Sequence, residues 1–390
     1  MRILHAVEFY APSRGGAQEV VRRVSERMAE QGHHVTVATS ALPERTTYSM
    51  NGVRIEEFDI SGNAVRGMRG DTYDYQRYLI ERPFDVIMTY AAQQWTTDLL
   101  LEVSEEIKAP VVCAPCGYSG LRDPDYRHYF ETLPAKLRRL AGTVYHSDSY
   151  QDIQFARAHG LPNLHVIPNG AAASEFESFD DRGAVNLRQH YNVKGRLILT
   201  VGSHTGMKGH RQTIAAFAIA PIGPATLIVN GDARPGAGCT SSCRRLVRAL
   251  RRFLDAQGKR VLLLDLPRED LVAAYHAADA FMLLSGCECS PVVLHEAAAS
   301  ATPFISTDVG NAQEIASSTE AGVILPRQAR PIRSAARELT RLLREDDRHR
   351  AMAAAGRKAW LESFTWEQIA DSYLALYGSL VGQGSRTAAL

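Results

Sequence analysis

Short apolar runs alternate with helix-like segments along most of this chain, and this alternation constrains the fold more than any other feature. In the first part of the chain, the apolar runs occupy residues 2–7, 34–39, 53–58, 85–90, 110–114, 143–147 and 165–167. A second series follows at residues 197–202, 225–230, 261–265, 279–284 and 303–306. Strands that alternate with helices pair in parallel and are covered by helices on both faces. The sequence therefore predicts an α/β protein with two doubly wound modules.

The length of the chain agrees with two modules. A chain of 390 residues is too long for one typical core and suits two domains of about 150–200 residues each. With 45% hydrophobic residues, the chain can bury both cores. Between the two series of strands, the segment Ile167-Pro168-Asn169-Gly170 interrupts the pattern, because proline and glycine favour a turn or linker.

Charge excludes one class of partner and leaves another open. The formal net charge is +1, whereas proteins that bind nucleic-acid backbones usually carry a strong basic excess. Residues 243–254 place five arginines opposite an apolar face, and Lys136-Leu137-Arg138-Arg139 forms a shorter basic stretch. We interpret the longer stretch as an exposed amphipathic helix, and weak peripheral contact with an anionic membrane is the alternative.

Neither a signal peptide nor a metal site is expected. The apolar part of residues 1–7 is too short for a secretory signal, and no run reaches the eighteen or so apolar residues of a membrane helix. We therefore expect a soluble, cytoplasmic protein. The cysteines form three close pairs, of which one has the Cys-x-x-Cys spacing typical of zinc ligands, so we expect reduced, unligated thiols: Cys113 and Cys116, Cys239 and Cys243, Cys287 and Cys289.

The segment from Glu288 to Glu296 combines two carboxylates with a helix start. It follows the apolar run 280–284, so Glu288 falls on a strand-to-helix loop and Glu296 about two turns into the helix. Ser290 is a good N-cap and Pro291 suits the first helical position. The first N–H groups of such a helix, from Val292 and Val293 onward, point at the loop with a partial positive charge. This arrangement predicts a phosphate-binding site.

The Glu288–Glu296 segment resembles the E-x7-E signature of retaining nucleotide-sugar glycosyltransferases of family 4, which have the two-domain GT-B fold. The resemblance implies that Glu288 faces the donor sugar and Glu296 binds the ribose. It also implies two Rossmann-like domains that face a central cleft. Residues 1–170, joined by a crossing C-terminal helix at about 368–390, would form the acceptor-side domain, and residues 171–367 the donor domain.

Lys208 carries a second part of the resemblance. It lies in Val201-Gly202-Ser203-His204-Thr205-Gly206-Met207-Lys208-Gly209, at the carboxyl end of a predicted strand. The family has an Arg after the first glycine and a Lys-Gly five residues later, which implies that Lys208 contacts the donor diphosphate. Ser203 stands at the Arg position, and His204, His210 or Arg211 are candidates to replace the missing charge.

Three further segments bear on the site. Gly15 and Gly16 follow the first strand without completing a G-x-G-x-x-G fingerprint, and the resemblance implies that they lie against the donor diphosphate or the acceptor. Cys116 stands where many family members have His. Trp95 could stack on a sugar or belong to the core, and the turn around Gly310 and Asn311 resembles a structural G-G-x-x-E turn, with Asn311 accepted as a left-handed residue.

The resemblance implies a glycosyltransferase that moves a sugar from a nucleoside-diphosphate donor to an acceptor hydroxyl with retention of configuration, in the synthesis of a polysaccharide or glycosylated metabolite. The acceptor would be a carbohydrate, a lipid-linked or a small molecule, and no metal or other cofactor is expected. Two alternatives stay open: a nucleotide-sugar epimerase of the same fold and a non-catalytic nucleotide-sugar-binding protein. Glu288 and Lys208 are the predicted catalytic residues, and the predicted substrate-binding residues are Gly15, Gly16, Ser203, Lys208, Cys289, Ser290, Val292, Val293 and Glu296.

Overall fold

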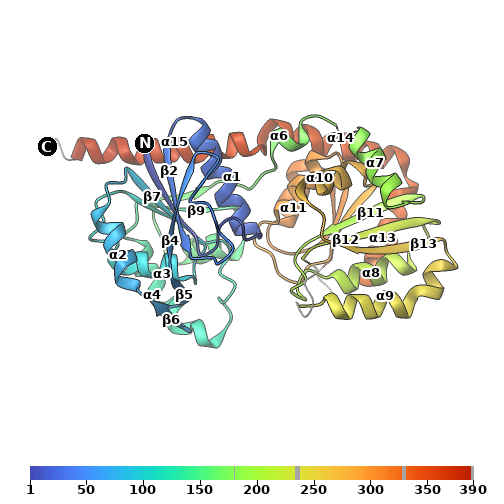
Figure 1. The fold of residues 1–390 in the computed structure, drawn as a ribbon, viewed down its shortest axis with the longest axis horizontal. Coiled ribbons are helices and arrows are strands. Elements are labelled where there is room, and N and C mark those ends of the chain that lie inside the picture. Colours follow the sequence, from blue (N-terminus) through green and yellow to red (C-terminus); the bar gives the residue numbers. More distant parts are fainter. Residues whose placement is uncertain (180, 233–237, 327–330, 388–390) are drawn as a thin grey trace. The chain divides into compact units, whose positions relative to one another are not determined.

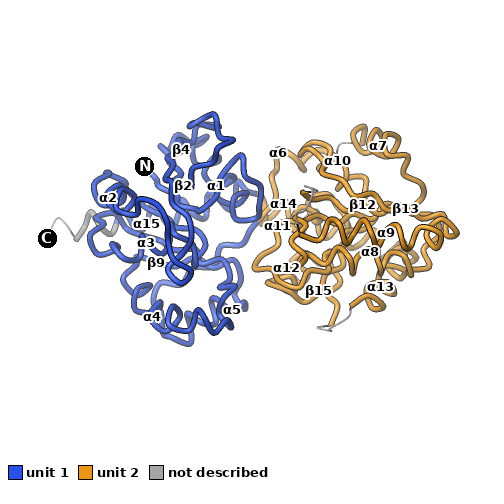
Figure 2. The backbone as a smooth tube through the Cα atoms, turned by 60° about the horizontal axis from the view of Figure 1, so that its bottom comes forward, with its two compact units in different colours: residues 1–169, 366–390 blue, residues 170–365 orange. Residues whose placement is uncertain are grey.

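The chain folds into two compact units. The computed structural model describes residues 1–179, 181–232, 238–326 and 331–387, with side chains up to residue 382 (Figure 1). Unit 1 contains residues 1–169 together with 366–390, and unit 2 contains residues 170–365 (Figure 2). Unit 1 is therefore made of two separate stretches of sequence, whereas unit 2 is continuous.

Unit 1 is built on an eight-stranded sheet with the order β10-β9-β8-β7-β1-β2-β4-β3. All neighbouring strands run parallel except β3, which pairs antiparallel with β4 at one edge. The strands are β1 (Arg2–Ala6), β2 (His34–Ser40), β3 (Ser49–Met50), β4 (Val53–Phe58), β7 (Val86–Tyr90), β8 (Val111–Ala114), β9 (Gly142–Tyr145) and β10 (Leu164–Val166). A separate antiparallel hairpin of β5 (Ile60–Asn63) and β6 (Gly67–Gly70) was not predicted from the sequence.

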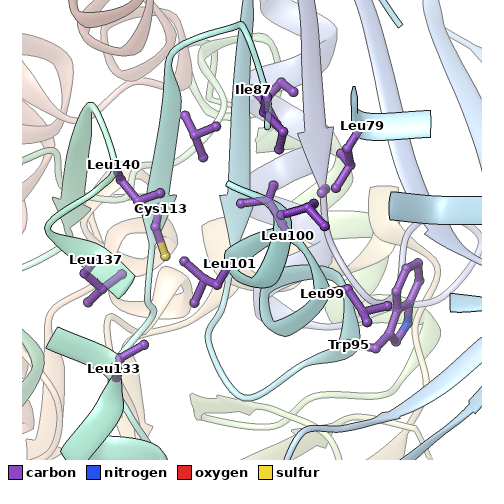
Figure 3. Close-up of a cluster of buried hydrophobic side chains, with 14 of the residues drawn as sticks. Leu79, Ile87, Trp95, Leu99, Leu100, Leu101, Cys113, Leu133, Leu137 and Leu140 are labelled. Carbon is purple, nitrogen blue, oxygen red and sulfur yellow. The ribbon is translucent and has the colours of Figure 1, made fainter. Parts of the chain in front are cut away.

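The helices of unit 1 connect and cover these strands. They are α1 (Gly16–Glu30), α2 (Thr72–Glu81), α3 (Trp95–Val103), the short 3-10 helix η1 (Pro124–Tyr126), α4 (Arg127–Leu137), α5 (Gln151–Ala158) and α15 (Trp366–Thr387). On one side of the sheet, α3 packs its leucines onto the strands, and Figure 3 shows Leu101 beside Cys113 and Leu99 beside Trp95. Continuous burial of β7 and β8 explains why both strands are apolar except at Thr89, which is buried as well.

Helix α15 belongs to unit 1 although it comes last in the sequence. It packs against α1 (Figure 1), and Arg27 of α1 pairs with Glu367 at 2.9 Å. The phenol of Tyr377 lies 3.1 Å from Nε2 of His5 on β1, and the other ring nitrogen of His5 lies 2.7 Å from the hydroxyl of Ser25 on α1. His5 is fully buried, so this hydrogen-bonded chain connects a strand and two helices inside the core.

Unit 2 contains a six-stranded parallel sheet with the order β13-β12-β11-β14-β15-β16. Its strands are β11 (Arg196–Val201), β12 (Ala225–Asn230), β13 (Lys259–Leu264), β14 (Ala280–Leu283), β15 (Phe304–Thr307) and β16 (Gly322–Leu325). The last of these was not predicted from the sequence. The first strand of the unit, β11, therefore lies beside the fourth, β14, and the order of connection reverses between them. Open α/β sheets bind ligands at the carboxyl ends of the strands at such a reversal.

Nine helices are described in unit 2, and they are α6 (Ala173–Phe176), α7 (Asp181–His190), α8 (His210–Ile219), α9 (Thr240–Asp255), α10 (Arg268–Ala277), α11 (Val292–Ala299), α12 (Ala312–Thr319), α13 (Ile332–Arg344) and α14 (Asp346–Ser363). Successive strand residues face opposite cores: Phe281 and Leu283 pack in one cluster, and Met282 packs in another. Both clusters are apolar because helices cover both faces of the sheet.

Among the described residues, no helix combines the length and the apolar character that crossing a membrane requires. The predicted basic stretch forms most of α9, and the five arginines of that stretch are exposed. The shorter stretch begins in the last turn of α4, and Arg139, which lies beyond the helix, pairs with Glu105 at 3.2 Å.

Candidate active site

Two loops meet at the reversal point of the unit 2 sheet. Residues 202–209 follow β11, and residues 284–291 follow β14, its parallel neighbour. Both loops leave the carboxyl ends of their strands, so they lie at the same edge of the sheet. The predicted catalytic residues Lys208 and Glu288 are on these two loops.

Lys208 and Glu288 form an ion pair in which the lysine ammonium contacts both oxygens of the carboxylate. The ammonium Nζ lies 2.7 Å from Oε1 and 2.8 Å from Oε2 of the carboxylate, although eighty residues separate the two positions. The side chain of Glu288 is 10% exposed and that of Lys208 is 29% exposed, so the pair is mostly shielded while the cation can still be reached from solvent. The structure therefore brings together the two residues that sequence reasoning assigned to catalysis.

Backbone contacts fix the two loops against each other. The N–H of Gly286 donates to the carbonyl of Met207 at 2.8 Å, and the hydroxyl of Ser285 donates to the same carbonyl at 3.1 Å. Gly209 has φ +70°, and a Cβ atom there would lie 1.8 Å from the carbonyl oxygen of Leu284. A glycine at position 209 is required both by the left-handed backbone and by this close approach.

Helix α11 begins directly after the Glu288 loop. Val292 is its first residue and Pro291 occupies the N-cap position, so the prediction that Ser290 is the N-cap and Pro291 the first helical residue is wrong by one position. The reason is that proline also fits the extended N-cap backbone, here φ −72° and ψ 104°. Val292 and Val293 still form the first turn, whose N–H groups have no partner within the helix. Cys289 and Ser290 are half-buried on the loop before it.

The turn at Gly310 supports this loop from the next strand connection. The N–H of Asn311 donates to the carbonyl of Cys289 at 2.8 Å, and a Cβ atom on Gly310 would lie 2.2 Å from the same oxygen. Gly310 has the left-handed backbone, with φ +55°, whereas Asn311 has φ −98°. The expectation that Asn311 adopts a left-handed conformation is wrong, because the preceding glycine supplies it.

Glu296 is the most enclosed acidic residue of the predicted set. It lies in the second turn of α11, and its side chain is 6% exposed. Its Oε1 lies 2.7 Å from Arg268, which also contacts Glu175 at 2.6 Å. Burial and the nearby charge of Glu296 raise the pKa of Tyr275 well above its usual value. Sequence reasoning missed Arg268, whose position at the start of α10 gives no sign that it reaches two carboxylates distant in sequence.

The sequence has Ser203 where the family has an arginine, and His204, His210 and Arg211 were the candidates to replace that positive charge. The structure excludes the two histidines. Ser203 is exposed on the loop after β11, but His204 and His210 are buried, at 3% and 1% exposure. Burial lowers the pKa of both imidazoles, that of His210 to about 4, so these side chains are neutral at pH 7. Arg211 is exposed. The histidines therefore do not replace the arginine.

In unit 1, the predicted residues lie in the loops that follow two strands. Gly15 is the N-cap of α1 with φ 175°, and Gly16 is the first helical residue. Cys116 follows β8 with φ +57° and is half-buried.

Trp95 is a core residue and not a sugar platform. It is fully buried and lies beside Leu99 (Figure 3). Its indole N–H donates to the hydroxyl of Ser40 at 2.9 Å, and its ring packs edge-on against Tyr75 and Phe58.

One Asp-x-Asp sequence, Asp123-Pro124-Asp125, occurs in the chain, and this pattern often holds a divalent ion beside a diphosphate. In the structure, the carboxylate of Asp123 accepts a hydrogen bond from the N–H of Asp125 at 3.1 Å and caps η1. The local structure therefore explains this pair as a helix cap.

Comparisons with known proteins agree with these features. The family model described as "Glycosyl transferases group 1" matches residues 186–359, and the model described as "Glycosyl transferase 4-like domain" matches residues 15–170. The chain belongs to the group 1 glycosyltransferase family. It is a glycosyltransferase, and the two parallel-sheet units form the GT-B fold.

Individual relatives resemble the chain over nearly its whole length. An N-acetyl-alpha-D-glucosaminyl L-malate synthase from Bacillus anthracis is 25% identical, over 94% of each chain. A D-inositol 3-phosphate glycosyltransferase from Xylanimonas cellulosilytica is 28% identical, over 93% of this chain and 91% of the relative. HepE from Anabaena, solved in complex with UDP, superposes with a TM-score of 0.77 at 17% identity, over 97% of this chain and 100% of its own. The first relative is named as a glucosaminyl malate synthase and the second as a glycosyltransferase, and neither name supports the epimerase alternative.

Proposed function

We propose that this glycosyltransferase moves a sugar from a nucleoside-diphosphate donor to an acceptor hydroxyl with retention of the anomeric configuration. The observation that carries the proposal is the Lys208–Glu288 pair beside the start of α11, at the reversal point of the unit 2 sheet. The donor diphosphate would bind there, against the Lys208 ammonium and the N–H groups of Val292 and Val293. Structure and family membership both support a donor site on unit 2.

The charges of the site suit the bond changes of the reaction. The bond between the anomeric carbon and the diphosphate oxygen breaks, the bond to the acceptor oxygen forms, and the departing phosphate takes up the acceptor proton. Negative charge grows on the leaving diphosphate, where Lys208 and the α11 amides stabilise it. Positive charge grows at the anomeric carbon, where the Glu288 carboxylate stabilises it. In this proposal, no metal takes part in the transfer.

Cys289 and Ser290 line the same loop and would contact the donor, and Ser203 would lie beside the diphosphate without adding a charge. Glu296 would accept hydrogen bonds from the ribose hydroxyls, with Arg268 holding its carboxylate in place. The donor would be a nucleotide sugar, since HepE, a protein of similar fold, was solved with UDP.

The acceptor would be a small molecule or a lipid-linked or carbohydrate acceptor. The two relatives described above are named for malate and inositol phosphate products or acceptors, which favours a small, polar acceptor. We place the enzyme in the cytoplasm, with the exposed arginines of α9 available for weak contact with an anionic membrane.

The proposal is tested by measuring release of nucleoside diphosphate from UDP-, GDP-, TDP- and ADP-sugars in the presence of an acceptor panel. For the donor that reacts, Lys208→Ala should lower kcat/KM by about 100-fold or more, because a charge that stabilises the leaving group is lost. Glu288→Gln, which keeps the shape but not the charge, should also lower kcat strongly. Lys194→Ala, at an exposed lysine of the same unit, is the matched control and should leave kcat/KM unchanged.

The stereochemical part of the proposal has its own measurement. Proton NMR of the product gives the anomeric configuration from the coupling constant of the anomeric proton. A product with the configuration of the donor supports retention, and an inverted product overturns it. Wild-type kcat/KM in both Lys208→Ala and Glu288→Gln would exclude the proposed site.

A further inference from the structure

Four side chains outside the proposed active site converge on one point in unit 2. His204 lies on the loop after β11 and His210 is the first residue of α8, while Cys239 and Cys243 lie at the start of α9. One nitrogen or sulfur atom from each of the four lies within 4.8 Å of the corresponding atoms of the other three. Three of these residues are buried and Cys239 is half-buried.

The distances within this His/Cys cluster fit a tetrahedral metal site. The Nδ1 atoms of His204 and His210 are 3.2 Å apart, and Sγ of Cys239 lies 3.4 Å from the first and 3.8 Å from the second. Zn–N and Zn–S bonds of usual length at tetrahedral angles separate two nitrogens by about 3.3 Å and a nitrogen from a sulfur by about 3.6 Å. Three of the four ligand atoms therefore already have the spacing of a zinc coordination sphere, and the atom of Cys243 lies within 4.8 Å of them.

The surroundings of the two imidazoles also favour a metal site. Among the described residues, neither Nε2 atom has a hydrogen-bond partner, whereas the Nδ1 atoms of both rings contact other members of the cluster. Cys239 and Cys243 are not joined in a disulfide. Two thiolates and two neutral imidazoles around Zn²⁺ make an uncharged complex, which avoids the cost of burying a net charge.

Backbone contacts hold the two halves of the cluster together. The N–H of Cys239 donates to the carbonyl of His204 at 2.8 Å, and a Cβ atom on Gly238 would lie 1.3 Å from the same oxygen. The N–H of Cys243 donates to the carbonyl of Cys239 at 2.9 Å, which places the two cysteines one turn apart on one face of α9. These contacts hold the His-x5-His segment against the Cys-x3-Cys segment, and the lack of a side chain at Gly238 allows the two backbones to lie this close.

We propose that His204, His210, Cys239 and Cys243 bind one zinc ion in a closed structural site. Thiolate and imidazole ligands in tetrahedral geometry select zinc among the common divalent ions. Binding replaces the two thiol protons, which leave to solvent, by two Zn–S bonds. Because the protein supplies four ligands, no position is left for a substrate or a reactive water, so the ion has a structural role. This proposal departs from the sequence-based expectation of unligated thiols.

A zinc ion in this cluster would also affect the proposed active site. His204 and His210 flank the segment that contains Lys208, so the ion would fix both ends of that segment to the sheet and to α9. This consequence rests on the proposed function, but zinc binding itself does not. Metal content and spectra measure binding without any transfer reaction, so the two proposals can fail separately.

The first experiment measures zinc in protein purified under reducing conditions from zinc-supplemented medium. By inductively coupled plasma mass spectrometry, the wild-type chain should contain about one zinc per molecule, and Cys239→Ser, Cys243→Ser, His204→Ala and His210→Ala should each lose most of it. Cys116→Ser and His190→Ala are matched controls outside the cluster and should keep the wild-type content. Equal zinc content in wild type and in the two cysteine variants would overturn the proposal.

A second experiment uses only the wild-type protein, so it remains informative if the variants do not fold. Titration of metal-free wild-type protein with Co²⁺ should produce thiolate-to-cobalt charge transfer and the intense visible bands of tetrahedral cobalt, saturating at one equivalent. Added Zn²⁺ should remove these bands by competition. A folded wild-type protein that contains no zinc and develops no thiolate–cobalt absorption would overturn the proposal.

Discussion

At the scale of single residues, the Lys208–Glu288 pair shows what can be read from the sequence and what cannot. Each residue was predicted because it lies in a recognisable pattern after an apolar strand. The distance of 2.7 Å between Nζ of Lys208 and Oε1 of Glu288 depends on the sheet topology, because the two loops meet only when β11 and β14 are neighbouring strands. The ion pair gives Lys208 a carboxylate partner, so in the proposed mechanism the donor diphosphate would share the ammonium with Glu288.

The glycines before α1 lead to a prediction about the donor or acceptor. Gly15 has an extended backbone that any residue can adopt, and a Cβ atom on Gly16 would contact nothing within 4 Å. The local fold therefore does not require glycine at position 16. Gly16→Ala should leave the melting temperature unchanged or slightly raised, because alanine favours helix. It should lower kcat/KM by about 10-fold or more if a ligand approaches this backbone closely.

Gly378→Ala is the matched control for this prediction, since position 378 on α15 also has open space around it. Circular dichroism melts and steady-state kinetics on both variants give the comparison. Wild-type kcat/KM in Gly16→Ala, with every reactive donor and acceptor, would show that these glycines are an ordinary turn.

Other residues were beyond sequence reasoning for physical reasons. Arg268 contacts Glu175 and Glu296, which lie 93 and 28 positions away, and no local pattern encodes such a contact. The His/Cys cluster was missed because the cysteines were compared with each other and not with the histidines. Trp95 could not be assigned to core or surface until the ring was seen against Tyr75.

At the scale of elements, the apolar periodicity predicted the strands of both sheets well where helices bury both faces, as in β7 and β14. Prediction failed for short elements whose stability comes from neighbours. The strand β16 is half-buried at three of its four positions and is paired with β15, and the hairpin of β5 and β6 contains glycines at residues 62, 67 and 70. The strand β16 has only three consecutive apolar residues, Val323 to Leu325, and the hairpin has no apolar run, whereas a buried strand is recognised by a run of roughly four to eight.

The contact between β1, α1 and α15 predicts a specific pH dependence for unit 1. Burial lowers the pKa of His5 from 6.5 to about 3, so the folded protein keeps it neutral while the unfolded chain binds a proton below pH 6.5. The unfolded state then carries more protons between about pH 6.5 and 3, and stability falls as the pH falls through this window. From pH 7.5 to 5.5, His5 should account for a loss of about 1.4 kcal/mol in the free energy of unfolding.

The comparison uses the free energy of unfolding of unit 1 in guanidinium chloride at the two pH values. His5→Gln is less stable at pH 7.5, but its stability should fall by about 1.4 kcal/mol less than that of the wild type on moving to pH 5.5. His146 is also buried and is present in both proteins, so its contribution cancels. The prediction fails if the two proteins lose the same stability over this interval.

At the scale of the whole molecule, the two units differ in how their sequence is arranged. Unit 2 is continuous from residue 170 to 365, so residues 170–365 should fold alone with cooperative thermal unfolding. Unit 1 needs α15, on which Trp366, Tyr373 and Tyr377 are each at most 1% exposed. Loss of three buried aromatic side chains costs about as much as the whole stability of a domain. Residues 1–169 alone should therefore lack a cooperative transition.

Circular dichroism melts of the two fragments test this prediction, with the full chain measured in parallel. Adding a synthetic peptide of residues 366–387 to fragment 1–169 is the matched rescue and should restore cooperative unfolding. If fragment 1–169 unfolds cooperatively at the temperature of unit 1 in the full chain, α15 is not required for that core.

Because unit 1 is made of two separate stretches of sequence, the order in which the two units can finish folding during synthesis is also determined. A ribosome makes β1 and α1 early, but their cover, α15, leaves the exit tunnel only after all of unit 2 has been made. The nascent chain therefore holds an incomplete sheet through the synthesis of nearly two hundred further residues, and unit 2 can finish folding before the unit that precedes it. The domain that is begun first is completed last, which makes its exposed β1–α1 face a binding surface for chaperones in that interval.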